Sequence, residues 1–158
     1  MNKKKNKTPN YLENSKEIAD ELNELLSDYQ VFYMNVRGFH WNIKGEKFFE
    51  LHMKFEELYN DLAMKIDEIA ERIRTLGFFP LHTFKDYLEH ATVKPVKNQS
   101  EGKECVKEIV KALETILPKQ HKILIMTEDT DESTNALMSD YLREQEKLLW
   151  MYRSYLGQ

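Results

Sequence analysis

Two kinds of side chain that bind transition metals recur between positions 40 and 71. His40 comes first, His52 and Glu56 follow four residues apart, and Asp67 and Glu71 form a second pair at the same spacing. Two imidazoles and three carboxylates suit Fe(II), Zn(II) or Mn(II), whereas calcium prefers a shell of oxygens alone. The pattern predicts that these five residues bind a transition metal.

The two pairs lie on one expected helix, over 46–76, in a stripe beside its apolar face. His52 and Asp67 are fifteen residues apart, which is roughly 22 Å along a helix, so one chain cannot close the site. Both pairs share a midpoint between residues 61 and 62. Two copies of this helix, packed antiparallel about a two-fold axis, would place each pair opposite the other. Carboxylates on a solvated helix face are the plain alternative.

The rest of the chain is expected to form the helices that position this segment. Apolar residues recur every three or four positions, which predicts an all-α four-helix bundle with helices over 11–41, 46–76, 100–127 and 133–155. A short extra helix within 81–91 would lie in the long crossover between the second and third helices, as in ferritin-like bundles. None of the five histidines follows a glutamate by three positions, which disfavours a di-iron site inside the bundle.

Composition agrees with a single helical domain over 11–158. The 158 residues are 41% hydrophobic and 32% charged, with five glycines and four prolines. The apolar runs are too short for a membrane span, and the start lacks a secretory signal, so a cytoplasmic protein without membrane contact is expected. Cys105 is the single cysteine, which excludes an intrachain disulfide.

The motif "FHWNIKGEKFFELHMKFEELY" followed by "IDEIAERI" resembles the Dps family, the mini-ferritins or DNA-binding proteins from starved cells. The resemblance extends from about residue 11 to "KLLWMYRSYL" near the end of the chain. It implies a homo-oligomer, a hollow dodecamer built from two-fold dimers, that is cytoplasmic and associated with the nucleoid. It also implies a ferroxidase that oxidises Fe(II), preferably with hydrogen peroxide, stores ferric oxyhydroxide and so protects DNA.

The resemblance also assigns roles to individual residues. His40, His52 and Glu56 would come from one subunit and Asp67 and Glu71 from its partner, together holding a dinuclear iron site, with zinc as a substitute. Glu56 stands where aspartate is also familiar in the family. An aromatic residue in the place of Trp41 lies close to the iron in the family.

The segment "EDTDESTNA" resembles the region that forms acidic pores about the three-fold axes. Asp131 and Glu132 are the expected pore carboxylates, since rings of carboxylates attract cations. Ala136 departs from the pattern at a position where a further acid is expected. The plain alternative for the two acids is a favourable interaction with a helix start.

The first ten residues are expected to form a disordered, lysine-rich tail. Its cations are Lys3, Lys4, Lys5 and Lys7, and without them the formal charge changes from −4 to −8, because 19 basic side chains then face 27 acidic ones. Twelve such tails could bind DNA phosphates without sequence preference. A nucleoid-compacting protein with little ferroxidase activity is therefore the alternative function, and a helical bundle with no metal role is a third.

Overall fold

The structure is a computed structural model, and it describes residues 14–158. Five helices follow one another along this part of the chain, and no residue in it belongs to a β-strand. Their bounds are α1 Ser15–Asn42, α2 Phe48–Thr75, α3 Phe84–His90, α4 Gly102–Thr127 and α5 Glu132–Leu156. The predicted four long helices and the short helix in the crossover are confirmed. The expected lysine tail lies outside the described residues.

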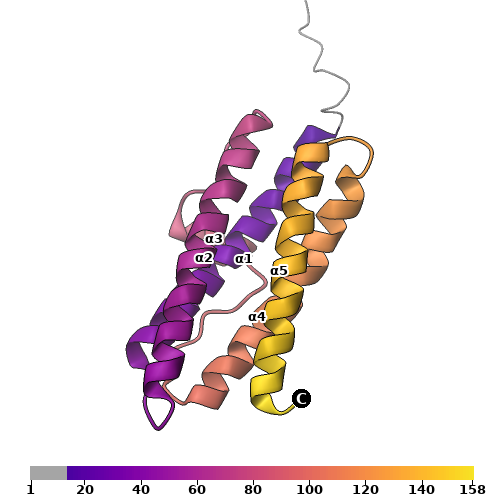
Figure 1. Cartoon of the computed structure of the whole chain (residues 1–158). Coiled ribbons are helices and arrows are strands. Elements are labelled where there is room, and N and C mark those ends of the chain that lie inside the picture. Colours follow the sequence, from indigo (N-terminus) through magenta and orange to yellow (C-terminus); the bar gives the residue numbers. More distant parts are fainter. Residues whose placement is uncertain (1–13) are drawn as a thin grey trace, which may run out of the picture.

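The four long helices form a bundle with one long crossover, so that α2 and α4 run in the same direction (Figure 1). α1 and α2 make an antiparallel pair joined by a short turn, and α4 and α5 make a second pair. The crossover returns from the end of α2 to the opposite end of the bundle, where Lys44 donates its backbone N–H to the carbonyl of Ser100 at 3.0 Å. α2 and α5 lie side by side although no loop joins them directly.

Local sequence explains where the helices begin and end. The side chains of Thr83, Glu101 and Asp131 accept hydrogen bonds from the first backbone N–H groups of α3, α4 and α5. Gly77 ends α2 in the left-handed region, with φ at 95°. At Gly102 the reason for glycine is space, because a Cβ there would lie 2.7 Å from Cδ1 of Leu51.

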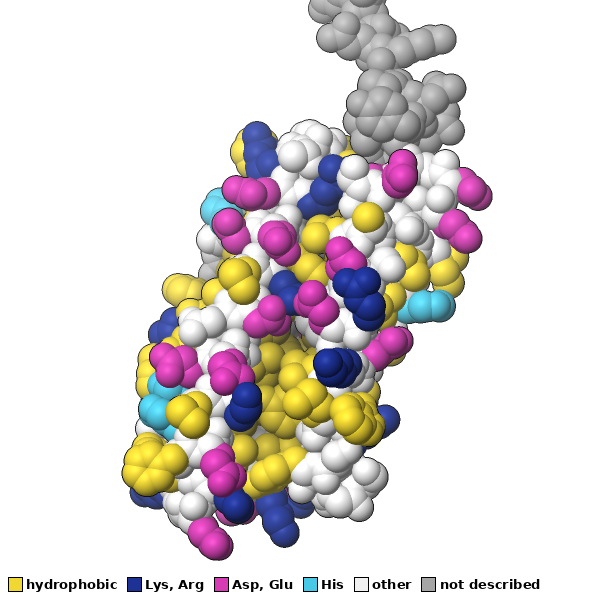
Figure 2. Space-filling view, viewed as in Figure 1, with side chains coloured by type: hydrophobic (Ala, Val, Ile, Leu, Met, Phe, Trp, Pro, Cys, Tyr) yellow, Lys and Arg dark blue, Asp and Glu magenta, His cyan; other side chains and the backbone are white. Residues whose placement is uncertain are grey.

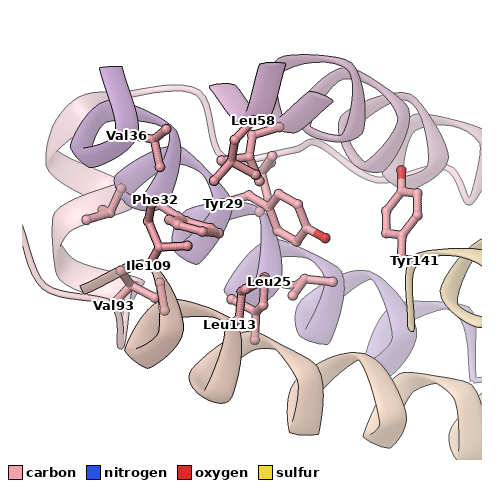
Figure 3. Close-up of a cluster of buried hydrophobic side chains, with 14 of the residues drawn as sticks. Leu25, Tyr29, Phe32, Val36, Leu58, Val93, Ile109, Leu113 and Tyr141 are labelled. Atoms are coloured by element: carbon pink, nitrogen blue, oxygen red, sulfur yellow. The ribbon is translucent and has the colours of Figure 1, made fainter. Parts of the chain in front are cut away.

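Apolar residues from every long helix meet in one core (Figure 3). The close-up shows side chains of α1 and α4 packed face to face, with Leu58 of α2 and Val93 of the crossover closing the cluster. Tyr29 in its middle is fully buried, and its hydroxyl accepts hydrogen bonds from Gln120 and Gln145. The fold thus buries one contiguous core and leaves an outer stripe of α2 exposed.

The crossover is held on α1 by three polar side chains. Asn23 accepts from the backbone N–H of Leu81, and buried Asp28 accepts from Thr92 and Val93 at 2.6 and 2.8 Å. Asn35 both donates to and accepts from the crossover backbone. These bonds satisfy loop amides that would otherwise be buried without partners. The crossover is therefore attached along α1.

Candidate metal half-site

His40, near the end of α1, and His52, in the first turns of α2, stack against each other. Their ring centroids are 3.7 Å apart and their planes differ by 19°. Nδ1 of His40 lies 2.7 Å from the backbone carbonyl oxygen of His52, and Nδ1 of His52 lies 2.9 Å from the carbonyl oxygen of His40. Each histidine is thus bound to the backbone of the other.

These two hydrogen bonds determine the tautomer of both rings. A carbonyl oxygen only accepts, so each Nδ1 carries the proton and donates it. In the neutral form of each ring the lone pair is then on Nε2, the arrangement in which histidines bind metal ions while a backbone carbonyl orients the ring. The chain therefore presents two preoriented imidazole ligands side by side.

Aromatic residues surround the histidine pair. The ring of Phe48 stacks on His52 with centroids 5.0 Å apart, and the ring of Tyr59 meets His40 edge-on at 5.3 Å. The Tyr59 hydroxyl donates to Oε1 of Glu56 at 3.5 Å. Loss of hydration and the nearby Glu56 carboxylate raise the pKa of the Tyr59 phenol, so it is protonated at neutral pH. The position of Tyr59 had not been anticipated from the sequence, although it follows Glu56 by one helical turn.

The three predicted carboxylates lie on the exposed side of α2. Glu56, Asp67 and Glu71 are exposed, His52 is half-buried, and His40 is 8% exposed. Glu56 lies close to the histidine pair through Tyr59, whereas Asp67 and Glu71 lie three to four turns further along the helix. Within residues 14–158 no three metal-binding side chains come close enough together to hold an ion. His40, His52 and Glu56 together are the half-site of one chain.

Trp41 follows His40 but makes a different contact. Its side chain is 61% exposed, and the guanidinium carbon of Arg37 lies 4.6 Å from the ring centroid. Arg37 also donates to the hydroxyl of Tyr33 at 2.9 Å. Arg37 thus holds the Trp41 ring on the outer surface of α1. Within a single chain, Tyr59 is the tyrosine that contacts the histidine pair.

The two predicted pore acids differ in their surroundings. Asp131 is 5% exposed and accepts a hydrogen bond from Arg72 of α2 at 2.7 Å, besides those from the backbone and hydroxyl of Thr134. Burial alone would raise the Asp131 pKa, but the bonds from Thr134 and Arg72 outweigh burial and lower it. Glu132 and Ala136 are exposed. Asp131 therefore joins α2 to the start of α5, and the pore role of both acids stays a prediction.

A groove runs between α2 and α5, and one buried lysine bridges it. Figure 2 shows apolar side chains at its floor and charged side chains across its middle. Cavities of about 250 and 260 Å³ lie along it. The Lys65 ammonium is bound at 2.6 Å to Asp61 and at 2.8 Å to Glu144 of α5. Sequence patterning did not identify this bridge, because Lys65 lies among the apolar residues of the helix.

Cys105 is buried in α4, and burial raises the pKa of its thiol to about 12. It is therefore protonated at neutral pH and chemically unreactive. None of the helices within residues 14–158 is both long enough and apolar enough for a membrane span.

The chain is similar to known proteins of the same architecture. The ferritin-like domain family matches residues 19–158. A crystal structure of a Dps protein from Vibrio cholerae O1, described as a member of a broad superfamily of ferritin-like diiron-carboxylate proteins, is 51% identical with a TM-score of 0.90, and the match covers 92% of both chains. The DNA protection during starvation protein of Porphyromonas gingivalis is 45% identical over 139 residues, 87% of each chain.

A further relative, DNA protection during starvation protein 2 of Bacillus anthracis, is 37% identical over 145 residues, which are 91% of this chain and 99% of that protein. The bundle and these matches define a ferritin-like protein. Within that class, the chain belongs to the Dps family.

Proposed function

We propose that this protein oxidises Fe(II) at sites shared between two subunits and stores the ferric product in a hollow dodecamer. Hydrogen peroxide is the preferred oxidant. The observation that carries the proposal is the histidine pair, whose two Nε2 lone pairs are presented at one end of α2 while Asp67 and Glu71 stand exposed towards its other end. Family membership gives the prior expectation of iron chemistry.

The placement of the ligands supports sharing across a two-fold axis. Glu56 and Asp67 are equidistant from the middle of α2, and so are His52 and Glu71. An antiparallel copy of α2 would bring Asp67 and Glu71 of the second subunit to the half-site of the first, and the reverse at the other end. Each dimer would then hold two sites of two imidazoles and three carboxylates, a donor set that binds iron and also zinc.

Two iron ions bound in one site would let peroxide be reduced without release of hydroxyl radical. Two Fe(II), one H₂O₂ and two protons give two Fe(III) and two H₂O, so both electrons needed to break the O–O bond come from iron. No hydroxyl radical is released in this stoichiometry. Carboxylates stabilise the higher charge of Fe(III), and the neutral histidines hold the ions in place. We place Glu132 and Asp131 at the acidic pore through which Fe(II) reaches the interior.

The test is anaerobic loading with Fe(II), followed by a stoichiometric pulse of peroxide. Ferric absorbance and hydroxyl-radical yield are recorded for wild type and for a His52→Ala/Asp67→Ala variant. The matched control is His121→Ala/Asp20→Ala, which removes an exposed histidine and an exposed aspartate from other helices. Rapid oxidation with few radicals in wild type and control, lost in the first variant, is expected. Equal oxidation in all three proteins would refute the shared site.

DNA contact is the second candidate function, favoured by the four lysines among the first seven residues. Deleting residues 1–8 is expected to abolish DNA retardation at low salt while iron oxidation is unchanged. Retained DNA binding in the deletion variant would assign the contact to the folded body. Location in the cytoplasm, in association with the nucleoid, belongs to this proposal.

A further inference from the structure

A cavity of about 480 Å³ lies between the crossover and α4. The crossover contributes residues 92–97 to its wall, α4 contributes residues within 108–115, and Asn35 of α1 completes it. His40, His52 and Glu56 are not among its lining residues. Its volume is in the range of pockets that bind small molecules. The cavity is therefore a candidate binding site separate from the metal half-site.

The charged side chains of this cavity are mostly cationic. Lys94 and Lys97 of the crossover and Lys111 of α4 line it, together with the carboxylate of Glu108. The Lys111 ammonium is bound to that carboxylate at 2.6 Å, so this pair is neutral as a whole. Lys94 and Lys97 therefore give the cavity an excess of two positive charges.

Lys94 and Lys97 differ from most lysines of the described chain because they lack a carboxylate partner. None of the ion pairs within residues 14–158 involves either side chain. The Lys94 ammonium donates to the backbone carbonyl of Ala91 at 3.4 Å, which is a neutral acceptor. Two cations without a counter-charge in one cavity favour an anion as its ligand.

The wall that carries these two lysines is held in place by hydrogen bonds of the fold. Asn35 donates to the backbone carbonyl of Lys94 and accepts from the backbone N–H of Val96. Buried Asp28 accepts from the backbone N–H of Val93 at 2.8 Å. The crossover backbone is thus fixed before a ligand binds, which lowers the entropy cost of binding.

We propose that this cavity binds small phosphate anions, with the ammonium groups of Lys94 and Lys97 donating to the phosphate oxygens. Hydrogen bonds between ammonium and phosphate groups are charge-assisted and stronger than neutral ones. A diphosphate group has oxygens and charge enough to bind both lysines at once. Among the described residues no aromatic side chain lines the cavity, so a nucleotide base has no ring to stack on. The ligand class is therefore a diphosphate group, inorganic or part of a nucleotide.

The experiment measures binding of pyrophosphate, ATP and inorganic phosphate to the purified, metal-free protein by titration calorimetry. Low salt is used because ions screen the attraction between exposed charges. Lys94→Gln/Lys97→Gln removes the two uncompensated charges, and Glu108→Gln removes the carboxylate of the cavity. The matched control is Lys16→Gln/Lys147→Gln, which removes two exposed lysines from α1 and α5.

Wild type is expected to bind pyrophosphate and ATP with similar dissociation constants, and inorganic phosphate more weakly. Lys94→Gln/Lys97→Gln should weaken pyrophosphate binding at least about tenfold, because both charge-assisted hydrogen bonds are lost. Glu108→Gln should strengthen it several-fold, because the Lys111 ammonium then also attracts the anion. The control variant, and the protein without residues 1–8, should bind pyrophosphate as wild type does.

Four results would overturn the proposal. Equal weakening in Lys94→Gln/Lys97→Gln and in the control would mean that overall charge attracts the anion. Loss of binding without residues 1–8 would place the site on the N-terminal lysines. Binding of ATP but not of pyrophosphate would mean that the base is recognised. Loss of DNA retardation in Lys94→Gln/Lys97→Gln, with pyrophosphate binding unchanged, would assign the two lysines to DNA. The outcome is independent of iron oxidation, which none of these titrations involves.

Discussion

His40 and His52 each donate Nδ1–H to the backbone carbonyl of the other, across distances of 2.7 and 2.9 Å. The two residues are twelve positions apart and lie on different helices, so the contact also closes the turn between α1 and α2. One pair of hydrogen bonds thus orients two metal ligands and joins two helices. Folding itself prepares this half-site before any ion binds.

Asparagine at position 52 should separate these two roles. Its side-chain N–H can occupy the place of Nδ1, but it has no lone pair at the place of Nε2. We expect the free energy of unfolding of His52→Asn to lie within about 0.5 kcal/mol of the wild-type value. That of His52→Ala should be lower by about 1 kcal/mol, the usual net contribution of one hydrogen bond. Both should bind Co(II) at least roughly tenfold more weakly. Guanidinium unfolding and anaerobic Co(II) titration measure these effects, with His121→Asn as control.

Mixed dimers should restore activity if each site is shared. In a dimer of His52→Ala with Asp67→Ala, one site carries both changes and the other site carries neither. Random pairing makes half of the dimers mixed, so roughly a quarter of all sites are intact. Coexpression of the two variants should therefore recover about a quarter of the wild-type rate of Fe(II) oxidation, while each variant alone has almost none. No recovery would indicate that all ligands of a site come from one chain.

Protein stability should fall more when the two carboxylates of the Lys65 bridge are neutralised than when the lysine itself is removed. Asp61→Asn/Glu144→Gln leaves the Lys65 ammonium, which is 5% exposed, without a counter-charge and should cost about 3 kcal/mol or more. Lys65→Met should cost only about 1 kcal/mol, because the Asp61 and Glu144 side chains are 36% and 54% exposed and remain hydrated. Denaturant unfolding compares them, with Lys54→Met as the exposed control. Equal losses would mean that Lys65 is not effectively buried.

Acid should weaken the contact between α2 and α5 through Asp131. Its folded-state pKa lies below the ordinary value of 3.8, so its contribution to stability is present above that pH and is lost as pH falls through the folded-state pKa. Asp131→Asn keeps a helix-capping side chain but loses the charge facing Arg72. We expect it to lose about 1–3 kcal/mol at pH 7 and to show a flatter stability profile below pH 4. The control Glu132→Gln should follow the wild-type profile.

Much of the fold could be predicted from the sequence because helical periodicity is a local property. The apolar residues Ile18, Leu22, Leu25, Phe32 and Val36 mark the buried face of α1, and all five are buried in the structure. The end of α2 also follows from local chemistry, because Gly77 readily adopts the left-handed conformation found there. The predicted ends differ from the observed ones by a few residues at most.

The candidate ligands could also be predicted from spacing alone. Residues four apart lie on one face of a helix, and residues fifteen apart are too far from each other to bind one ion. The sequence therefore already indicated that His52 and Asp67 of one chain belong to different metal sites. The exposed positions of Glu56, Asp67 and Glu71 are compatible with that prediction. Their assembly into one site stays a prediction.

Contacts between helices were decided only by the tertiary structure. Four contacts depend on how two helices cross: the stacking of His40 on His52, the contact of Tyr59 with His40, the Lys65 bridge and the Arg72–Asp131 pair. The sequence determined which face of each helix is apolar and which residue types stand on it, because that information repeats along one helix. Which side chains from different helices meet depends on packing distances and rotamers, which no single helix contains.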